Sequence, residues 1–229
     1  MRVVAWNIKA GGTGRTAGVV ERLEALRAEV AVVGAVPPNG GGAKLRGYLE
    51  AAGFEHQVAV EPPPRGTTLL VASREPISAG SLDGAPVPAS WLHVEGLPFE
   101  LGAVYGPGQD GDPAASGARA RWLDWLGEAV AEWRERPALL CGDFHTGRSG
   151  VDVEGVGGQF QDLLDEGWRD LFRERHGEAR EWSWWSPDGS SGRLDHALGS
   201  PALEAPVAVS YAGAAGLTEH RPLVVDVAC

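Results

Sequence analysis

Hydrophobic residues along this chain occur in short runs separated by turns rich in glycine and proline. Short apolar or β-branched runs are typical of buried strands, whereas apolar residues three or four positions apart are typical of amphipathic helices. The short runs predict strands at 3–8, 30–36, 56–60, 67–73, 90–94, 100–105, 138–144, 182–185, 193–198, 206–210 and 222–227. Helical spacing predicts helices at 17–28, 43–52, 117–135 and 158–166.

The order of these elements predicts the fold class. Helices and strands alternate early in the chain and again after its middle, and a strand-rich stretch lies between the two regions. An α/β (α+β) fold suits this order: a four-layer αββα sandwich of two mixed β-sheets packed face to face, with helices outside. A chain of 229 residues can bury a sizeable core, and its length fits one large domain or two small ones.

The tryptophans fall into groups with different expected roles. Trp122, Trp125 and Trp133 lie on the predicted amphipathic helix 117–135 and are expected in the core. Trp182, Trp184 and Trp185 lie on the predicted strand 182–185 and are the better candidates for stacking on nucleic-acid bases. Alternation along this strand directs Trp184 and Trp185 to opposite faces.

Composition narrows the function classes. The net charge of −11 argues against tight binding to long duplex DNA, which usually needs a basic face, whereas carboxylates suit a divalent cation. The two cysteines, Cys141 and Cys229, do not make a disulfide framework. The chain opens without a signal-peptide pattern, and no window reaches the ~18–20 apolar residues of a membrane span. A cytoplasmic protein without a membrane partner is expected.

Short polar clusters stand where predicted strands give way to loops: at Asn7, 142–145, 193–195 and 219–222. Loops at the ends of stacked sheets converge, so clusters far apart in sequence can line one pocket. Asp143 follows a buried strand and a glycine, so its carboxylate emerges at the strand's end. The alternative for Asp143 is an ordinary turn or N-cap aspartate.

A second acidic residue, Asp195, sits in an apolar segment and therefore needs a partner. His220 is one candidate, because an Asp–His pair would fix the imidazole tautomer and raise the histidine pKa. An ion pair with Arg193 is the other candidate, and both remain open. Glu219 and His220, just before the last predicted strand, can supply a metal ligand and a proton donor.

Five motifs in order resemble the endonuclease/exonuclease/phosphatase superfamily, and the chain is most similar to its exonuclease III and AP endonuclease branch. The motifs are Trp6-Asn7, Tyr105-Gly106-Pro107, Gly142-Asp143-Phe144-His145, Arg193-Leu194-Asp195 after a tryptophan-rich stretch, and Thr218-Glu219-His220-Arg221-Pro222. The resemblance spans essentially the whole chain and implies one domain over 1–229.

The resemblance also implies roles. Asn7 and Glu219 would lie near the metal, Asp143 would orient and help deprotonate the attacking water, and Tyr105 would touch the phosphate. His220, held by Asp195, would stabilise the pentacovalent phosphoryl group. The expected catalytic set is His220, Asp195, Asp143, Tyr105 and His145. The expected substrate-binding set is Asn7, Arg193 and Trp185.

The chain departs from the family pattern at the expected metal site. Ala35 stands where the family has a ligand glutamate, His145 replaces an asparagine, and Glu219 replaces an aspartate. Losing a carboxylate weakens a Mg²⁺ site. Mg²⁺ or Mn²⁺ is the expected cofactor, with Zn²⁺ as an alternative because of His145.

The function expected from these residues is a divalent-metal-dependent phosphodiesterase or nuclease with a divergent metal site. Two alternatives stay open: a phosphatase or diesterase for a small phosphorylated metabolite, and an inactive phosphate-binding relative. The expected partner is nucleic acid or a small phosphorylated substrate, and the expected state is a monomer. The net charge of −11 favours a small substrate, whereas the tryptophan-rich strand favours nucleic acid.

Overall fold

The computed structural model describes residues 1–9, 14–61, 63, 66–81, 84–108, 113–154 and 158–228, and all of their side chains except those of 113–116. Two six-stranded sheets form the centre of this part of the chain. The spatial order of the first sheet is β13 (Ala208–Tyr211), β14 (Leu223–Asp226), β1 (Arg2–Asn7), β2 (Val30–Val36), β4 (Thr68–Ser73) and β3 (His56–Ala59). The second sheet has the order β5 (Ser78–Ala79), β6 (Trp91–Glu95), β7 (Glu100–Tyr105), β8 (Ala138–Asp143), β12 (Asp195–Gly199) and β9 (Arg169–Asp170).

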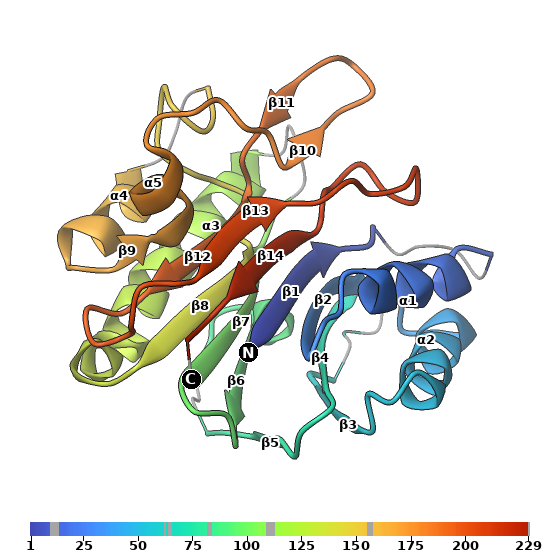
Figure 1. The fold of residues 1–229 in the computed structure, drawn as a ribbon. Coiled ribbons are helices and arrows are strands. Elements are labelled where there is room, and N and C mark those ends of the chain that lie inside the picture. Colours follow the sequence, from blue (N-terminus) through green and yellow to red (C-terminus); the bar gives the residue numbers. More distant parts are fainter. Residues whose placement is uncertain are drawn as a thin grey trace.

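Both sheets are mixed in the same way. Each has one parallel pair near its centre, β1 with β2 and β7 with β8, and its other pairs are antiparallel. A separate two-stranded ribbon, β10 (Trp184–Trp185) and β11 (Ser191–Gly192), lies beyond the sheets at the top of the molecule (Figure 1).

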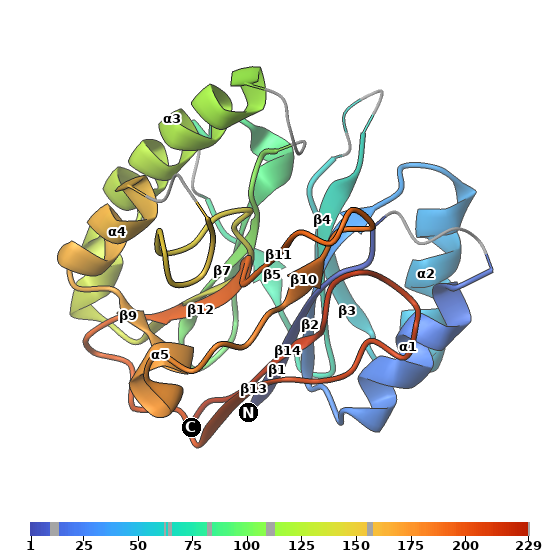
Figure 2. The ribbon, with the colours of Figure 1, turned by 90° about the horizontal axis from the view of Figure 1, so that it is seen from above.

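Helices cover the two outer faces, as the view from above shows (Figure 2). The first sheet is covered by α1 (Thr16–Ala25) and α2 (Gly40–Ala51), and the second by α3 (Pro113–Ala129) and α4 (Gly158–Asp165). The short α5 (Leu171–His176) follows β9, and the 3-10 turns are η1 (Pro88–Ser90) and η2 (Ala131–Glu135). The predicted four-layer sandwich is confirmed.

Side-chain alternation along the strands explains the layers. In β1, Val3 and Ala5 belong to the core between the sheets, whereas Val4 and Trp6 belong to the core beneath α1 and α2. A third core lies beneath α3 and α4 and contains the fully buried Trp122. The prediction of Trp122 as a core residue is therefore confirmed.

Element boundaries differ from the predicted ones where local chemistry overrides the pattern. α2 begins at Gly40, three residues before the predicted start, because Asn39 caps it by accepting a hydrogen bond from Gly41 N. The predicted helix 117–135 ends as an α-helix at Ala129 and continues as the 3-10 turn η2. α5 was not predicted, because six residues are too few for a helical period to show.

Within the described residues, no helix is both long enough and apolar enough to cross a membrane.

Candidate active site

A group of polar residues lies at one edge of the hydrophobic core between the two sheets, where several strands begin or end. Asn7 ends β1, Tyr105 ends β7, Asp143 ends β8, and Asp195 begins β12. All are in phase with inward-facing core residues of their own strands, so alternation points them into the space between the sheets. In the register of the second sheet, Asp143 is the partner of Tyr105 on one side and of Asp195 on the other.

A side-chain hydrogen bond joins the two sheets at this point. Asn7 Nδ2 donates to Asp143 Oδ2 at 2.7 Å, and the two residues are each 3% exposed. Each also accepts a bond from the backbone two residues later, Lys9 N to Asn7 Oδ1 at 2.8 Å and His145 N to Asp143 Oδ1 at 2.8 Å. Lys9 and His145 have left-handed backbones, with φ of 46° and 53°. These Asx-type turns fix both side chains at the strand ends.

His220 completes the cluster from the end of the chain. Its Nδ1 lies 3.0 Å from Asp195 Oδ2, and its Nε2 lies 3.4 Å from Asn7 Nδ2. The expected Asp195–His220 contact is thus confirmed, and the alternative partner of Asp195, Arg193, lies elsewhere. Burial lowers the pKa of the His220 imidazole, but the carboxylates of Asp195 and Asp143 more than offset this and raise it above its ordinary value.

The charges of the cluster act on Asp143 in the opposite direction. Burial raises the pKa of the Asp143 carboxyl, but His145, His220 and the Asn7 hydrogen bond lower it below its ordinary value. Asp143 is therefore a carboxylate at neutral pH, next to an imidazole that favours its protonated form. Such a pair of opposed shifts is typical of acid and base partners in an active site.

Tyr105 and His145 border the cluster. Thr67 Oγ1 donates a hydrogen bond to the Tyr105 hydroxyl at 3.2 Å, and burial raises the pKa of the Tyr105 phenol. The His145 ring lies 5.8 Å from the Tyr105 ring, and its Nδ1 lies 2.8 Å from the Gly106 carbonyl oxygen. Both residues stand where the sequence placed them, beside Asp143.

Arg193 does not take the substrate-binding place expected of it. The side chain is 0% exposed, and its Nε and one Nη donate to the two Asp152 oxygens at 2.8 and 2.9 Å. It also donates to Asp170, and Arg173 binds Asp152 from another side. A guanidinium shared by two buried carboxylates has no surface to offer a substrate. This corrects the prediction and makes Arg193 a structural residue beneath Asp195.

Two of the positions expected near a metal ion, Glu219 and Ala35, do not offer a free carboxylate to it. Glu219 is at the mouth of the site with its side chain 40% exposed, and its Oε2 lies 2.7 Å from Lys9 Nζ. Ala35 is buried, has a left-handed backbone with φ of 58°, and lies in the irregular stretch of β2 between Val33 and Val36. It offers no oxygen side chain for a metal.

Two groups of acidic and histidine side chains in the described part of the chain are close enough to hold a metal ion. They are Asp143 with Asp195 and His220, and Asp152 with Asp170 and His196. The second group is already bridged by Arg193, so its negative charge is neutralised within the protein. The first group forms the hydrogen-bonded network around Asn7.

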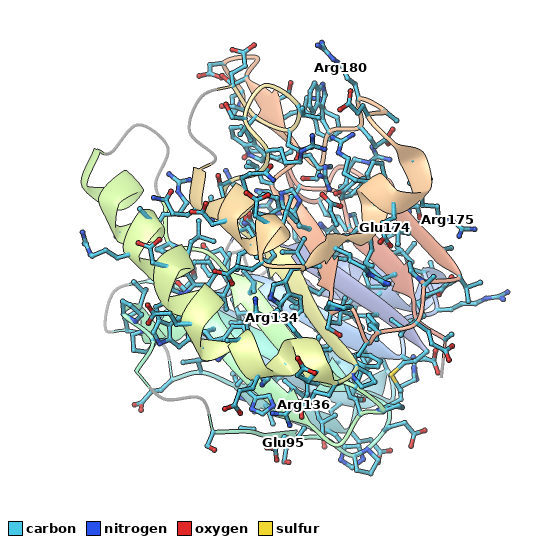
Figure 3. All side chains as sticks on the ribbon, turned by 90° about the vertical axis from the view of Figure 1, so that its left-hand side faces the viewer. Glu95, Arg134, Arg136, Glu174, Arg175 and Arg180 are labelled. Carbon is cyan, nitrogen blue, oxygen red and sulfur yellow. The ribbon has the colours of Figure 1, made fainter. Side chains whose placement is uncertain are left out.

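A cavity of about 710 Å³ opens next to the cluster and is lined by His145, Trp182, Trp184 and Arg180, among others. Figure 3 shows Arg180 extending outward at the top of the molecule. Trp184 is 9% exposed and Trp185 is 42% exposed, which confirms that they face opposite sides. The exposed Trp185, expected to bind substrate, is the partner of Ser191 in the ribbon β10–β11.

Sequence reasoning missed some of the residues that shape this site. Lys9 is the clearest case, although its position two residues after Asn7 on the same strand end was a usable signal. The buried partners Asp152 and Asp170 were also missed, because both lie in segments without a motif.

Comparisons with known proteins concern the family and the fold of the chain. Residues 4–217 match the sequence profile of the Endonuclease/Exonuclease/phosphatase family. No curated protein sequence matches the chain. The structure of an AP endonuclease from Archaeoglobus fulgidus is similar at 18% identity, with a TM-score of 0.86 and both chains fully covered.

Two structures from Neisseria are also similar. The 3′ phosphatase NExo from Neisseria, bound to product DNA hairpin, is 19% identical, with a TM-score of 0.84 and both chains fully covered. The 3′-5′ exonuclease NExo from Neisseria meningitidis is 21% identical, with a TM-score of 0.84 and 99% of each chain covered. At these identities the likeness shows the fold.

Proposed function

Because the chain belongs to the endonuclease/exonuclease/phosphatase family, we propose that it hydrolyses phosphoester bonds in nucleic acid at the cluster of Asp143 and His220. The observation that carries the proposal is the buried chain of contacts from Asp195 through His220 to Asn7 and Asp143. It combines a carboxylate of lowered pKa with an imidazole of raised pKa, at a point that borders an open cavity.

In the proposed reaction, a water oxygen attacks phosphorus and the bond from phosphorus to the leaving oxygen breaks. Asp143 orients the water and accepts its proton, for which a carboxylate at neutral pH is required. His220, held by Asp195 and with its pKa raised, donates a hydrogen bond to the phosphoryl oxygens and stabilises the charge that develops there. Tyr105 contacts the phosphate from the opposite side of Asp143.

Several features favour nucleic acid as the substrate. The solved structures that share the fold include an AP endonuclease and a phosphatase bound to a DNA hairpin. Trp182 and Trp184 line the cavity, and the exposed Trp185 lies on the same ribbon as Trp184, so aromatic faces are available for base stacking.

A second candidate substrate is a small phosphorylated metabolite. The net charge is −11, and the cavity lining includes the carboxylates of Glu154 and Asp188 beside the single cation Arg180. This lining repels the backbone of a long nucleic acid more than it repels a single phosphate group.

The family resemblance implies Mg²⁺ or Mn²⁺, but the positions that it assigns to the ion, Asn7, Glu219 and Ala35, fit such an ion poorly. Asn7 Oδ1 already accepts a backbone hydrogen bond, Glu219 is paired with an ammonium, and Ala35 supplies no oxygen. We therefore assign no step of the reaction to a metal ion.

The test is an assay on abasic DNA, 3′-phosphorylated oligonucleotides and bis-p-nitrophenyl phosphate, each with Mg²⁺, Mn²⁺, Zn²⁺ or EDTA. We expect cleavage of at least one substrate and a loss of about 100-fold or more in Asp143→Asn and His220→Gln. Absence of cleavage under every condition, with phosphate binding unchanged in His220→Gln, would leave the protein a phosphate-binding relative without catalysis.

A further inference from the structure

A cluster built around one lysine stands at the mouth of the proposed active site, and we call it the lysine cluster: Lys9, Glu219 and Trp184. Lys9 Nζ lies 2.7 Å from Glu219 Oε2 and 5.8 Å from the centroid of the Trp184 ring. The backbone of Lys9 donates to Asn7 Oδ1 at 2.8 Å. Lys9 thus contacts both Asn7 and Glu219, the two side chains that the family resemblance assigns to a metal ion.

Trp184 connects this cluster to His220. The Trp184 ring lies 6.3 Å from the His220 ring, and the two residues also form an isolated β-bridge. Trp184 therefore has the imidazole of His220 near its ring and the ammonium of Lys9 near it as well. The backbone of Lys9 is left-handed, with φ of 46°, and its side chain contacts Glu219.

The charge balance here disagrees with a divalent cation. A Mg²⁺ ion in a protein is usually held by one or two carboxylates with water and phosphate oxygens. The Glu219 carboxylate is already neutralised by Lys9, and Gly34 and Ala35, at the end of β2, carry no side-chain oxygen. A divalent ion placed there would have to displace the ammonium of Lys9 and would be repelled by it.

We propose that the ammonium of Lys9 supplies the fixed positive charge that binds the substrate phosphate, so that hydrolysis does not depend on a divalent cation. This inference rests on the proposed function and concerns the same site. The phosphate displaces Glu219 as the partner of Lys9, and Glu219, which is 40% exposed, turns toward solvent. Water still adds to phosphorus while the bond from phosphorus to the leaving oxygen breaks. The proton of the water passes to Asp143, and the leaving oxygen takes a proton from solvent.

A lysine is suited to this role as a compact point charge with rotatable donors, which is how lysines bind phosphate in other sites. The chain contains only two lysines, Lys9 and Lys44. Lys44 is exposed on α2, away from the site, so Lys44→Met is a control matched in residue type and in charge change.

The experiment compares the wild type with Lys9→Met, Lys9→Arg and Lys44→Met after exhaustive treatment with EDTA. Cleavage of the best substrate is measured in EDTA and again with Mg²⁺ or Mn²⁺. Binding of Mn²⁺ alone is measured by electron paramagnetic resonance, and binding of inorganic phosphate in EDTA is followed by tryptophan fluorescence.

We expect the wild type and Lys44→Met to keep most of their kcat/KM in EDTA. Lys9→Met should lose about 100-fold, because one electrostatic group at a transition state contributes on that order, and Lys9→Arg should lose less. Lys9→Met should also bind Mn²⁺ at least about tenfold more tightly than the wild type, because Glu219 is released.

Three results would overturn the proposal: wild-type activity that disappears in EDTA and returns with Mg²⁺, a Lys9→Met variant as active in EDTA as Lys44→Met, or tighter Mn²⁺ binding by the wild type. If no variant cleaves anything, the proposed function fails and phosphate binding decides the role of Lys9. Binding that weakens in Lys9→Met alone supports a phosphate contact, and equal binding in all variants refutes it.

Discussion

Replacing Arg193 by methionine separates a structural role from a substrate-binding role, because the two make opposite predictions for stability and activity. The guanidinium is 0% exposed and bonds both Asp152 and Asp170. Methionine fills much of the same volume but leaves the carboxylates without their shared cation. We expect Arg193→Met to lose stability and to keep its affinity for substrate.

The size of the loss of stability depends on the partners that Asp152 and Asp170 keep in the variant. Breaking a buried ion pair by removing one member costs about 3–5 kcal/mol. Arg173 still binds Asp152, and His196 Nδ1 lies 3.8 Å from Asp170 Oδ2, so the lower part of this range is expected. A loss of about 3 kcal/mol lowers the melting temperature of a chain of this size by roughly 6–12 °C.

The assay is urea unfolding followed by tryptophan fluorescence and circular dichroism at pH 7, together with KM for the best substrate. Arg193→Lys, which keeps the charge but not the two-pronged contact, should lose about 1–2 kcal/mol. This milder variant keeps the test valid if Arg193→Met does not fold. A variant within about 0.5 kcal/mol of the wild type, with KM raised tenfold, would refute the structural role and restore the substrate contact.

Other predictions test different parts of the molecule. Gly142→Ala should destabilise by about 1–3 kcal/mol in urea unfolding, because φ is 147° and a Cβ would lie 2.0 Å from a carbonyl oxygen of β7. Gly47 lies within α2, and a Cβ there would meet no other atom. Gly47→Ala should therefore stabilise the protein by about 0.5–1 kcal/mol, and a loss of stability in both glycine variants would contradict the steric argument. Trp185→Ala should raise KM for an oligonucleotide about tenfold while leaving bis-p-nitrophenyl phosphate unaffected; an equal effect on both substrates would exclude base stacking. Burial raises the pKa values of Asp152 and Asp170, but their cationic partners lower them below their ordinary range, so the stabilisation is full above about pH 4 and lost as pH falls through the folded values. Calorimetry from pH 7 down to about pH 2 should show the onset of that loss below about pH 4, and a melting temperature that rises on acidification would refute the sign.

The sequence predicts those parts of the site that follow from strand periodicity. Asn7, Asp143 and Asp195 each stand at the end of an apolar strand, and alternation alone orients them toward the space between the sheets. The partnership of Asp195 with His220 was predictable as one of two alternatives, since a buried carboxylate needs a partner. The choice between His220 and Arg193 depends on which loops meet, and that information is tertiary.

The same limit explains the errors. Arg193 was placed in the substrate site because its partners, Asp152 and Asp170, lie 41 and 23 residues away in segments without periodicity. The pairing of Lys9 with Glu219 joins residues from opposite ends of the chain. No local pattern encodes such a contact, so the charge balance at the mouth of the site becomes visible only in the folded protein.

The adjacency of β1 and β14 has a consequence for biosynthesis. Asn7 ends β1 and His220 precedes β14, so the two residues are 213 positions apart in sequence, yet their side chains meet where these neighbouring strands adjoin the site. At about 5–20 residues per second, a ribosome needs roughly 10–40 seconds to add the residues between them. Throughout that time the nascent chain holds Asn7 without its partner. On the proposed function, a protein built this way does not hydrolyse the phosphoesters around it until His220 has been synthesised.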